Sequence, residues 1–403
     1  MKMLFLVSTF RRPNPSWHLM KALMEDVLDA GIEIHAIQRG YETFGMPPFP
    51  ESILNHKNFS YSEVPCTPVD KKKFVKRYLE AAQYSLKLRK YIRKNNDYDM
   101  IFMQSSINSF YVLCAAGHFA KKRHVIFNSQ DMFPGSAIAN GSMPKKWMQK
   151  IFYAMQRHAY KKATCFTAIS EDMKQKLIEQ GVPAEKIHVI VNWYDDTAVK
   201  EIPWDENRFV KQENMSKDKF YVQYAGTMGT NFNPDVIIDV AERLKDYEDI
   251  VFQMIGDGVR RKKFEGAANE KGLSNVVFLP LQPQDMVADV YSACSVCLIP
   301  LKRGVIGNSV PSKAGLLMAC GRVIVNSVDK ESDYYAMFER EKIGFSADTD
   351  GANKLAESIL ALYKDPGLRE DIGKRAKAFG EKYYSRSYNT KLYVDLFKEL
   401  YKQ

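Results

Sequence analysis

The chain alternates short apolar runs with longer stretches whose apolar residues recur at helical spacing. An apolar run at 3–7 is followed by a helix-start signal at 14–16, a helical stretch that ends near Gly31, and a second apolar run at 32–37. Such a β-α-β opening predicts parallel strands that are covered by helices on both faces.

The same alternation continues over most of the chain. Further strands are predicted at 100–104, 124–128, 164–169 and 187–191, with helices at 108–121, 145–160 and 171–180. A polar stretch at 193–219 interrupts the pattern and predicts an interdomain linker. Beyond it, strands are predicted at 220–224, 250–255, 276–279, 296–299 and 323–325, and helices at 352–363, 367–382 and 387–402.

These elements predict an α/β protein with two Rossmann-like, doubly wound domains. The first domain spans 1–192 and the second 220–382, and the final segment 383–403 is expected to pack back on the first domain as a helix. A chain of 403 residues with 45% hydrophobic content is long enough to build a core in each domain.

Composition favours a cytosolic protein. No apolar stretch approaches the length that spans a bilayer, and charge returns at Arg11 and Arg12 before a signal-peptide core could form. The six cysteines mostly lie inside apolar runs, which is typical of a reducing compartment. Cys294 and Cys297 form a C-x-x-C, but no second pair or nearby histidine completes a metal set, and we expect no metal site.

The net charge of +10 is concentrated in the first half. Segment 71–94 holds ten Lys or Arg against one Glu (10 − 1 = +9), and segment 143–163 holds six against none (+6), so the remainder carries −5. A solvated helix face is one explanation, but two such segments favour attachment to an anionic membrane surface. The cations expected at that surface are Lys71, Lys72, Lys73, Lys76 and Arg77. Val75, Leu79, Ala82 and Leu86 recur among them at helical spacing.

Nucleic acid is the other acidic partner to consider. The sequence contains no zinc-finger spacing, no RNP-like aromatic strand and no recognition helix, so we expect no nucleic-acid binding. The protein is therefore expected to be cytoplasmic and peripheral on the inner face of the cytoplasmic membrane.

Two glycine-rich turns and a lysine indicate where an anion binds. YAGTMG (224–229) and IGDG (255–258) each close an apolar strand, and VPSK (310–313) reads as a helix start. Glycine lets the main chain approach a ligand, and a helix start offers free amide donors to a phosphate. Lys313 adds a full positive charge there.

In this order, and together with VNWYDD (191–196) and MACG (318–321), these motifs resemble the family-four glycosyltransferases of GT-B fold over nearly the whole chain. The resemblance implies transfer of a sugar from a nucleotide-sugar donor, most commonly a UDP-sugar, with retention of configuration and without a cofactor or an essential metal. It also implies that the second domain holds the donor and the first the acceptor. SQDMFPG (129–135) is similar to an element of relatives that build surface polysaccharides on lipid-linked or glycan acceptors.

Sugar transfer requires positive groups where negative charge grows on the leaving diphosphate. Lys313 is the first candidate and Arg303 the second, although each could be an ordinary surface cation. Asp131 would accept or orient the acceptor hydroxyl, or else cap its own turn before Pro134; His18 and His118 are weaker alternatives. The donor-binding residues implied by the resemblance are Arg11, Arg12, Gly226, Thr227, Gly229, Gly256, Pro280, Leu281, Asn308, Ser309 and Ser312.

The sequence departs from the family at the donor site. The usual pair of glutamates aligns with Asn308 and Leu316, and the usual Arg and Lys after the first glycine turn are replaced by TNFNPD. These losses keep open a second hypothesis, a catalytically degenerate GT-B subunit that stabilises a partner glycosyltransferase. A nicotinamide enzyme is disfavoured, because STFRRPNPS stands where G-x-G-x-x-G would follow the first strand. The D-x-D matches at 97–99 and 348–350 are not expected to bind metal.

Overall fold

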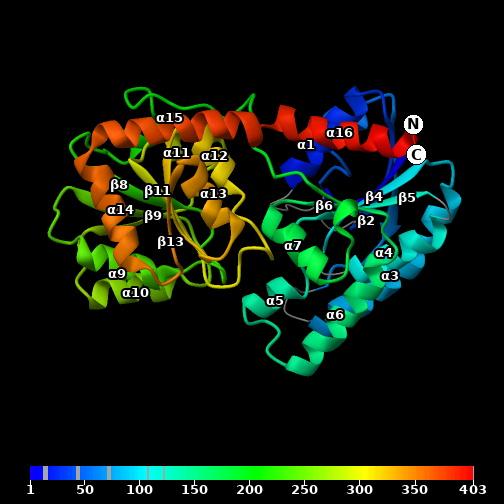
Figure 1. Cartoon of the computed structure of the whole chain (residues 1–403). Helices are drawn as coiled ribbons and strands as arrows, with labels where there is room; N and C mark the ends of the chain where they lie inside the picture. The colour runs from blue at the N-terminus through cyan, green and yellow to red at the C-terminus, as the bar shows by residue number, and fades with distance from the viewer. Residues whose placement is uncertain (12–16, 42–45, 70–73, 107–108, 121–122, 403) are drawn as a thin grey trace. The chain divides into compact units, whose positions relative to one another are not determined.

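The computed structural model describes residues 1–11, 17–41, 46–69, 74–106, 109–120 and 123–402. The chain divides into two compact units, one formed by Met1–Val191 with Asn389–Gln403 and the other by Asn192–Tyr388 (Figure 1). Each unit is built on its own parallel sheet with helices on both faces, which confirms the predicted fold class.

The first unit contains seven strands among its described residues. In chain order its elements are β1 (Lys2–Leu6), α1 (Trp17–Asp29), β2 (Glu33–Gly40), α2 (Glu51–Leu54), β3 (Phe59–Pro65), α3 (Phe74–Lys94), β4 (Met100–Gln104), α4 (Ser109–Phe119), β5 (His124–Ser129), α5 (Gly135–Ala139), α6 (Lys146–Tyr160), β6 (Cys165–Ala168), α7 (Glu171–Glu179), the 3-10 helix η2 (Ala184–Lys186), β7 (Ile187–Val189) and most of α16 (Arg386–Lys402).

The sheet of the first unit has the order β3-β2-β1-β4-β5-β6-β7. The strand order reverses between β1 and β4, so the loops after these two strands diverge at the carboxyl edge of the sheet. The final helix α16 is fastened to this unit through Tyr393, whose hydroxyl lies 3.2 Å from Asn128 Oδ1 and 3.3 Å from Thr167 Oγ1. All three side chains are buried, so the polar contacts fix the helix in one register.

The second unit contains six strands among its described residues. Its elements are α8 (Arg208–Gln212), β8 (Phe220–Ala225), α9 (Pro234–Arg243), β9 (Ile250–Ile255), α10 (Arg261–Glu270), β10 (Val276–Leu279), η3 (Gln284–Met286), α11 (Val287–Ser292), β11 (Val296–Pro300), α12 (Lys313–Ala319), β12 (Val323–Ser327), α13 (Asp333–Glu341), β13 (Gly344–Ala347), α14 (Ala352–Lys364) and α15 (Pro366–Tyr383).

Its sheet has the order β10-β9-β8-β11-β12-β13, and the order reverses between β8 and β11. Figure 1 shows α9 and α10 on one face of this sheet and α11 and α12 on the other. Strands β8 and β11 are buried along their whole length, as expected for central strands of a sheet covered on both faces.

Three parts of the sequence fold differently from the expectation. Strand β13 was not predicted, and neither was β3, an edge strand in which only Val64 is fully buried. The segment 193–219, predicted as a linker, belongs to the second unit. It contains α8, where Arg208 binds Asp289 at 2.7 Å and Asp285 at 3.0 Å.

Candidate functional site

The ammonium group of Lys313 is the centre of the candidate site, at the carboxyl edge of the second unit's sheet. Lys313 is the first residue of α12, and its Nζ donates to the carbonyl of Ala225 at 2.9 Å. The same nitrogen lies 3.9 Å from the centre of the Tyr224 ring. Among the described residues no carboxylate pairs with Lys313, so this cation is held only by a carbonyl dipole and an aromatic face.

The charge state of Lys313 follows from this enclosure. The residue as a whole is half-buried, but its ammonium end is surrounded by protein. Burial lowers the pKa of Lys313 to about 8, because desolvation disfavours the charged form. An anion that binds beside such a cation raises its pKa, because an opposite charge favours the charged form.

Divergence of two strands creates the position that Lys313 occupies. The register of β8 and β11 pairs Val222 with Val296 and Gln223 with Cys297, and it continues no further along the two strands. The carbonyl of Ala225, at the end of β8, therefore faces α12 and α11 and accepts from Lys313 and from the Tyr291 hydroxyl at 3.3 Å. Parallel α/β sheets bind ligands at such a switch point.

Three glycines interlock around the end of β8. Gly226 has φ +148°, and a Cβ built there would lie 2.7 Å from Lys313 Nζ. A Cβ on Gly256 would lie 2.1 Å from the Gly226 carbonyl oxygen, and one on Gly258 would lie 2.3 Å from the Met228 carbonyl oxygen. These close approaches explain why both turns need glycine, and they place the backbone of Gly226 against the lysine.

Three amides of these turns donate to other backbone groups. Gly226 N donates to Ile255 O at 2.9 Å, Met228 N to Asp257 O at 2.8 Å, and Gly256 N to Leu279 O at 3.2 Å. In helix α12 the amide of Ala314, the second residue, donates to Pro311 O at 3.2 Å. These four amides are occupied within the protein, whereas Lys313 brings a positive charge to the same place.

Two family models match the chain in succession. The model described as "Glycosyltransferase Family 4" matches residues 19–198, and the model described as "Glycosyl transferases group 1" matches residues 205–379. The chain belongs to the family-four glycosyltransferases. The identification confirms the family resemblance of the sequence motifs.

Curated relatives of this family-four chain are named as glycosyltransferases. WcaI of Escherichia coli K12, named as a glycosyl transferase of colanic acid biosynthesis, is 28% identical over 169 residues, which is 42% of this chain and 41% of WcaI. WbjE of Pseudomonas aeruginosa, named as a glycosyltransferase, is 24% identical over 233 residues, which is 57% of each chain. The chain thus spans about half the length of the curated relatives that it matches.

Solved structures share the fold over the whole chain. HepE of Anabaena, crystallised with UDP, superposes with a TM-score of 0.75 at 16% identity and covers 99% of this chain and 100% of HepE. The sucrose-phosphate synthase of Thermosynechococcus elongatus gives a TM-score of 0.77 at 15% identity, with 100% of both chains covered. These likenesses establish the two-domain GT-B fold.

Arg303 is placed differently from Lys313. Its guanidinium binds Asp348 at 3.1 Å and Asp350 at 3.6 Å, both after the edge strand β13. Those carboxylates raise the pKa of Arg303 and neutralise its charge. Arg303 is therefore paired with carboxylates, whereas Lys313 has none among the described residues, and the D-x-D match at 348–350 is explained as the partner of an arginine.

The other predicted donor residues of the second unit line the same carboxyl edge. Asn308 donates from Nδ2 to Gly304 O at 2.9 Å, which fixes its loop. Leu316, at the position of the missing glutamate, is half-buried in α12. Thr227, Pro280, Leu281 and Ser312 are exposed, whereas Gly229 and Ser309 are half-buried.

In the first unit, Arg11 is engaged by protein groups. Its guanidinium donates to both oxygens of Glu63, at 2.7 Å each, and to Met46 O at 2.9 Å. Glu63 also accepts from Gln38 at 2.8 Å, so Arg11 belongs to a network that holds the loop after β1. Arg12 lies outside the described residues.

Asp131 lies in the loop after β5. Its backbone amide donates to Ser105 Oγ at 3.1 Å, which joins this loop to the one after β4. Solvent reaches the residue, but the protein atoms around the carboxyl desolvate it and raise its pKa, against opposing hydrogen bonds from Ser136 and Met132. His18 and His118 are both exposed.

Three residues that support the site were not predicted from the sequence. Tyr224 lies under Lys313 and donates its hydroxyl to Thr227 O at 2.7 Å, and Tyr291 donates to Ala225 O. Arg261 joins the second turn to β10 by donating to Gly256 O and, at 3.0 Å, to Leu279 O. Tyr224 stands within the YAGTMG motif, but only the tertiary structure reveals its contact with the lysine.

We predict that replacing Lys313 changes the pH dependence of stability. Between pH 8 and 10.5 the folded protein binds fewer protons at Lys313 than the unfolded chain. The free energy of unfolding of the parent should therefore increase with pH relative to that of Lys313→Met. From pH 7 to pH 9.5 the gain should be on the order of 2 kcal/mol. Urea unfolding of both proteins at the two pH values measures it; a difference independent of pH would contradict the buried charge.

A second prediction concerns Gly226. Gly226→Ala should lower the free energy of unfolding by roughly 1–3 kcal/mol, because the backbone is at positive φ and the added methyl group meets Lys313 Nζ. Gly266→Ala is the matched control, since its Cβ meets open space in α10 and alanine favours a helix by up to about 1 kcal/mol. Equal free energies of unfolding for the two variants in urea would show that position 226 tolerates a side chain, which would contradict the close contact with Lys313.

Proposed function

We propose that this chain is a retaining hexosyltransferase that moves a sugar from a UDP-sugar to a lipid-linked or glycan acceptor in the synthesis of a cell-surface polysaccharide. The single observation that carries the proposal is Lys313, a buried ammonium without a carboxylate partner among the described residues. It lies where parallel α/β sheets bind phosphorylated ligands. Family membership and the relative named for colanic acid biosynthesis support the assignment.

The donor assignment follows from charge. As the bond between the sugar and the diphosphate breaks, negative charge grows on the leaving phosphate, and a fixed cation stabilises that transition state. Lys313 supplies this charge and would be fully protonated once the diphosphate lies beside it. UDP is favoured as the carrier because HepE, which shares the fold, was crystallised with UDP and with UDP-glucose.

On the acceptor side we assign Asp131 the positioning of the incoming hydroxyl. Its raised pKa makes the carboxylate a better proton acceptor than an ordinary aspartate. In a retaining, front-face reaction the proton of the incoming hydroxyl passes to the leaving phosphate as the new glycosidic bond forms. Asp131 then orients the hydroxyl by accepting its hydrogen bond.

We propose that the transfer needs no metal or cofactor. Lys313 provides the charge that a divalent cation supplies in other transferases. The acidic pairs that resemble metal-binding motifs already bind cations: Asp97 pairs with Lys2 at 2.6 Å, and Asp348 pairs with Arg303 at 3.1 Å. Among the described residues no group of three or more His, Cys, Asp or Glu side chains is arranged to hold a metal ion.

The alternative is a degenerate subunit that stabilises a partner glycosyltransferase. One observation favours it, namely that Asn308 and Leu316 occupy the positions of the family's acidic pair. The Asn308 amide is already bonded to Gly304 O, and Leu316 offers no acceptor for ribose hydroxyls. Under this alternative the fold would be retained but no nucleotide sugar would be consumed.

We further propose that the first unit lies on an anionic membrane. Helices α3 and α6 flank α4 and pack against it (Figure 1). Both helices present apolar side chains to solvent. Leu79 and Leu86 of α3 are 60% and 64% exposed, and Trp147 and Ile151 of α6 are 61% and 50% exposed. The residues of α3 that face the core are instead Ala81, Tyr84, Ser85, Leu88 and Ile92.

Exposed lysines surround these apolar residues. Lys76, Lys87 and Lys90 are exposed on α3, and Lys145, Lys146 and Lys150 are exposed at the start of α6. Apolar side chains ringed by cations are typical of surfaces that lie in the interface of anionic lipids. Lys71, Lys72 and Lys73 lie outside the described residues, as does the side chain of Arg77. Among the described residues, no helix combines the length and the apolar character that a membrane span requires.

The catalytic proposal predicts a large effect of one charge. Lys313→Ala should lower kcat/KM for sugar transfer by on the order of a hundredfold or more, the usual loss for one charge-stabilising donor. Lys330→Ala, an exposed lysine elsewhere in the same unit, should leave kcat/KM unchanged.

The assay has two parts. A thermal-shift panel of UDP, GDP, CMP, dTDP and ADP sugars identifies the donor, and release of its nucleotide in the presence of a lipid-linked acceptor then measures turnover. If the folded parent protein binds none of these donors and releases no nucleotide, the enzyme hypothesis is rejected and the degenerate-subunit alternative is favoured.

The membrane proposal predicts separate effects of charge and of apolar side chains. Replacing Lys76, Lys87 and Lys90 by Gln should weaken binding to anionic vesicles on the order of a hundredfold, since each cation contributes roughly 1 kcal/mol. Trp147→Glu should also weaken binding, because an apolar side chain that enters the lipid interface is replaced by a charged one. Liposome flotation measures both, with Lys200, Lys211 and Lys364 replaced by Gln in the second unit as the matched control. Equal recovery of all variants would reject this surface.

A further inference from the structure

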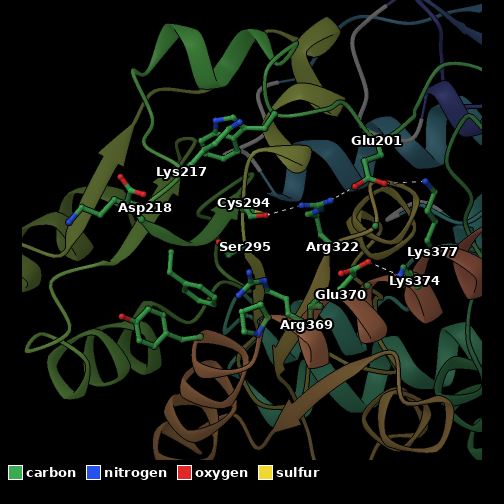
Figure 2. Close-up of a pocket in the computed structure, with 18 residues that line it drawn as sticks. Glu201, Lys217, Asp218, Cys294, Ser295, Arg322, Arg369, Glu370, Lys374 and Lys377 are labelled. Atoms are coloured by element: carbon green, nitrogen blue, oxygen red, sulfur yellow. Dashed lines mark hydrogen bonds and ion pairs between the residues drawn. The ribbon is translucent and has the colours of Figure 1, made fainter.

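A cavity of about 780 Å³ lies at the amino edge of the second unit's sheet, the edge opposite Lys313. Phe220 at the start of β8, Ser295 just before β11, and Arg322 just before β12 line it on the sheet side. Helix α15 closes the other side, and Figure 2 shows its side chains Arg369, Glu370, Lys374 and Lys377 along this wall. The volume falls in the range of small-molecule sites.

Most cations of this cavity are paired with carboxylates. Arg322 donates to Glu201 and to the backbone oxygens of Cys320 at 2.7 Å and Cys294 at 3.2 Å. Lys377 shares Glu201 at 3.1 Å, and Lys374 binds Glu370 at 2.6 Å (Figure 2). One carboxylate therefore serves two cations at the centre of the cavity wall.

Arg369 is the exception. Its guanidinium donates one hydrogen bond, from Nη1 to Leu362 O at 2.8 Å, and lies 5.3 Å from the centre of the Phe220 ring. Among the described residues no carboxylate pairs with it. Burial, and then the nearby charge of Arg322, lower the pKa of Arg369. A half-buried guanidinium with unused N–H donors beside a second cation attracts an anion.

The remaining lining adds a hydroxyl and aromatic rings. Ser295 Oγ accepts from Tyr221 N at 3.2 Å, and its own proton has no acceptor among the described residues. The Phe220 and Tyr363 rings meet edge to face at 5.5 Å, and Trp204 lies at the rim, stacked on Tyr221 at 6.2 Å. Such rings accommodate the face of a sugar or a base next to the charged group.

We propose that this cavity binds a small organic phosphate, with the phosphate on Arg369 and the attached ring against Phe220 and Tyr363. The proposal is independent of the sugar-transfer function, because Lys313 and Arg369 lie at opposite edges of the sheet. Strand β8 runs from one site to the other, with Phe220 at the cavity and Ala225 at Lys313. Both sites can therefore be filled at the same time.

The test is calorimetric titration of the full chain with uridine monophosphate, glucose 6-phosphate and inorganic phosphate, in parent and Lys313→Met protein. Binding of either ring phosphate to the Lys313→Met protein is expected. Arg369→Met should weaken it tenfold or more, and Arg340→Met, an exposed arginine paired with Asp333, should leave it within twofold. Tighter binding of uridine monophosphate would indicate that the ligand ring beside Phe220 and Tyr363 is a base, and tighter binding of glucose 6-phosphate that it is a sugar.

A second variant distinguishes loss of the Arg369 charge from loss of packing around Arg369. Lys374→Glu, on the exposed side of the same helix wall, should also weaken binding, because it places a negative charge at the cavity without removing a buried contact. Trp204 fluorescence should change on binding in the parent and not in Trp204→Phe. Absence of binding to Lys313→Met protein, or binding that survives Arg369→Met, would overturn the site, and equal affinity for inorganic phosphate would overturn the contact with the ring.

Discussion

The contact between the Lys313 ammonium and the Ala225 carbonyl is the constraint on which the candidate site depends. The two strands at the centre of the second sheet stop pairing at Gln223 and Cys297, and the carbonyl at the end of β8 is left for a side chain to use. Lys313 fills this position at the start of a short helix, and its Nζ atom leaves no room for a side chain on residue 226. The carbonyl of Gly226 in turn leaves no room for a side chain on residue 256. Glycine is therefore needed at both positions because of one buried cation and the backbone beside it.

The same packing decides how the site handles an anion. Because Gly226 N, Met228 N and Gly256 N donate to backbone oxygens, these three amides stabilise the fold, and the positive charge at the site comes from Lys313. A lysine is suited to this position, since its pKa can fall to about 8 while the site is empty and rise when a phosphate enters. With a pKa of about 8 the amine is still mostly protonated near pH 7, and an anion bound beside it favours the charged form further.

Sequence patterns predicted the fold because the central strands of both sheets are continuous apolar runs between amphipathic helices. They missed β3 and β13, each at an edge of its sheet, and in β3 the exposed residues hide the periodicity of the strand. They also predicted the position of Lys313, because helix-start and glycine signals are local. Local signals could not predict the carboxylates that pair with Arg11 and Arg303. Glu63 lies 52 positions from Arg11, and Asp348 follows a different strand from the loop that carries Arg303, so only the folded chain shows that both guanidinium groups are paired.

The two edges of the second sheet illustrate how the chemistry of a cation limits its burial. Lys313 can lose its proton, so the protein encloses its ammonium end against a carbonyl and a ring. Arg369 keeps its charge at any physiological pH, and full enclosure without a counter-charge would cost far more. Accordingly, Arg369 remains half-buried, with one face toward Phe220 and unused donors toward the cavity. The two cations contact opposite ends of β8, Arg369 at Phe220 and Lys313 at Ala225, and the strand between those residues is roughly 17 Å long at about 3.3 Å per residue. Each cation therefore has its own surroundings.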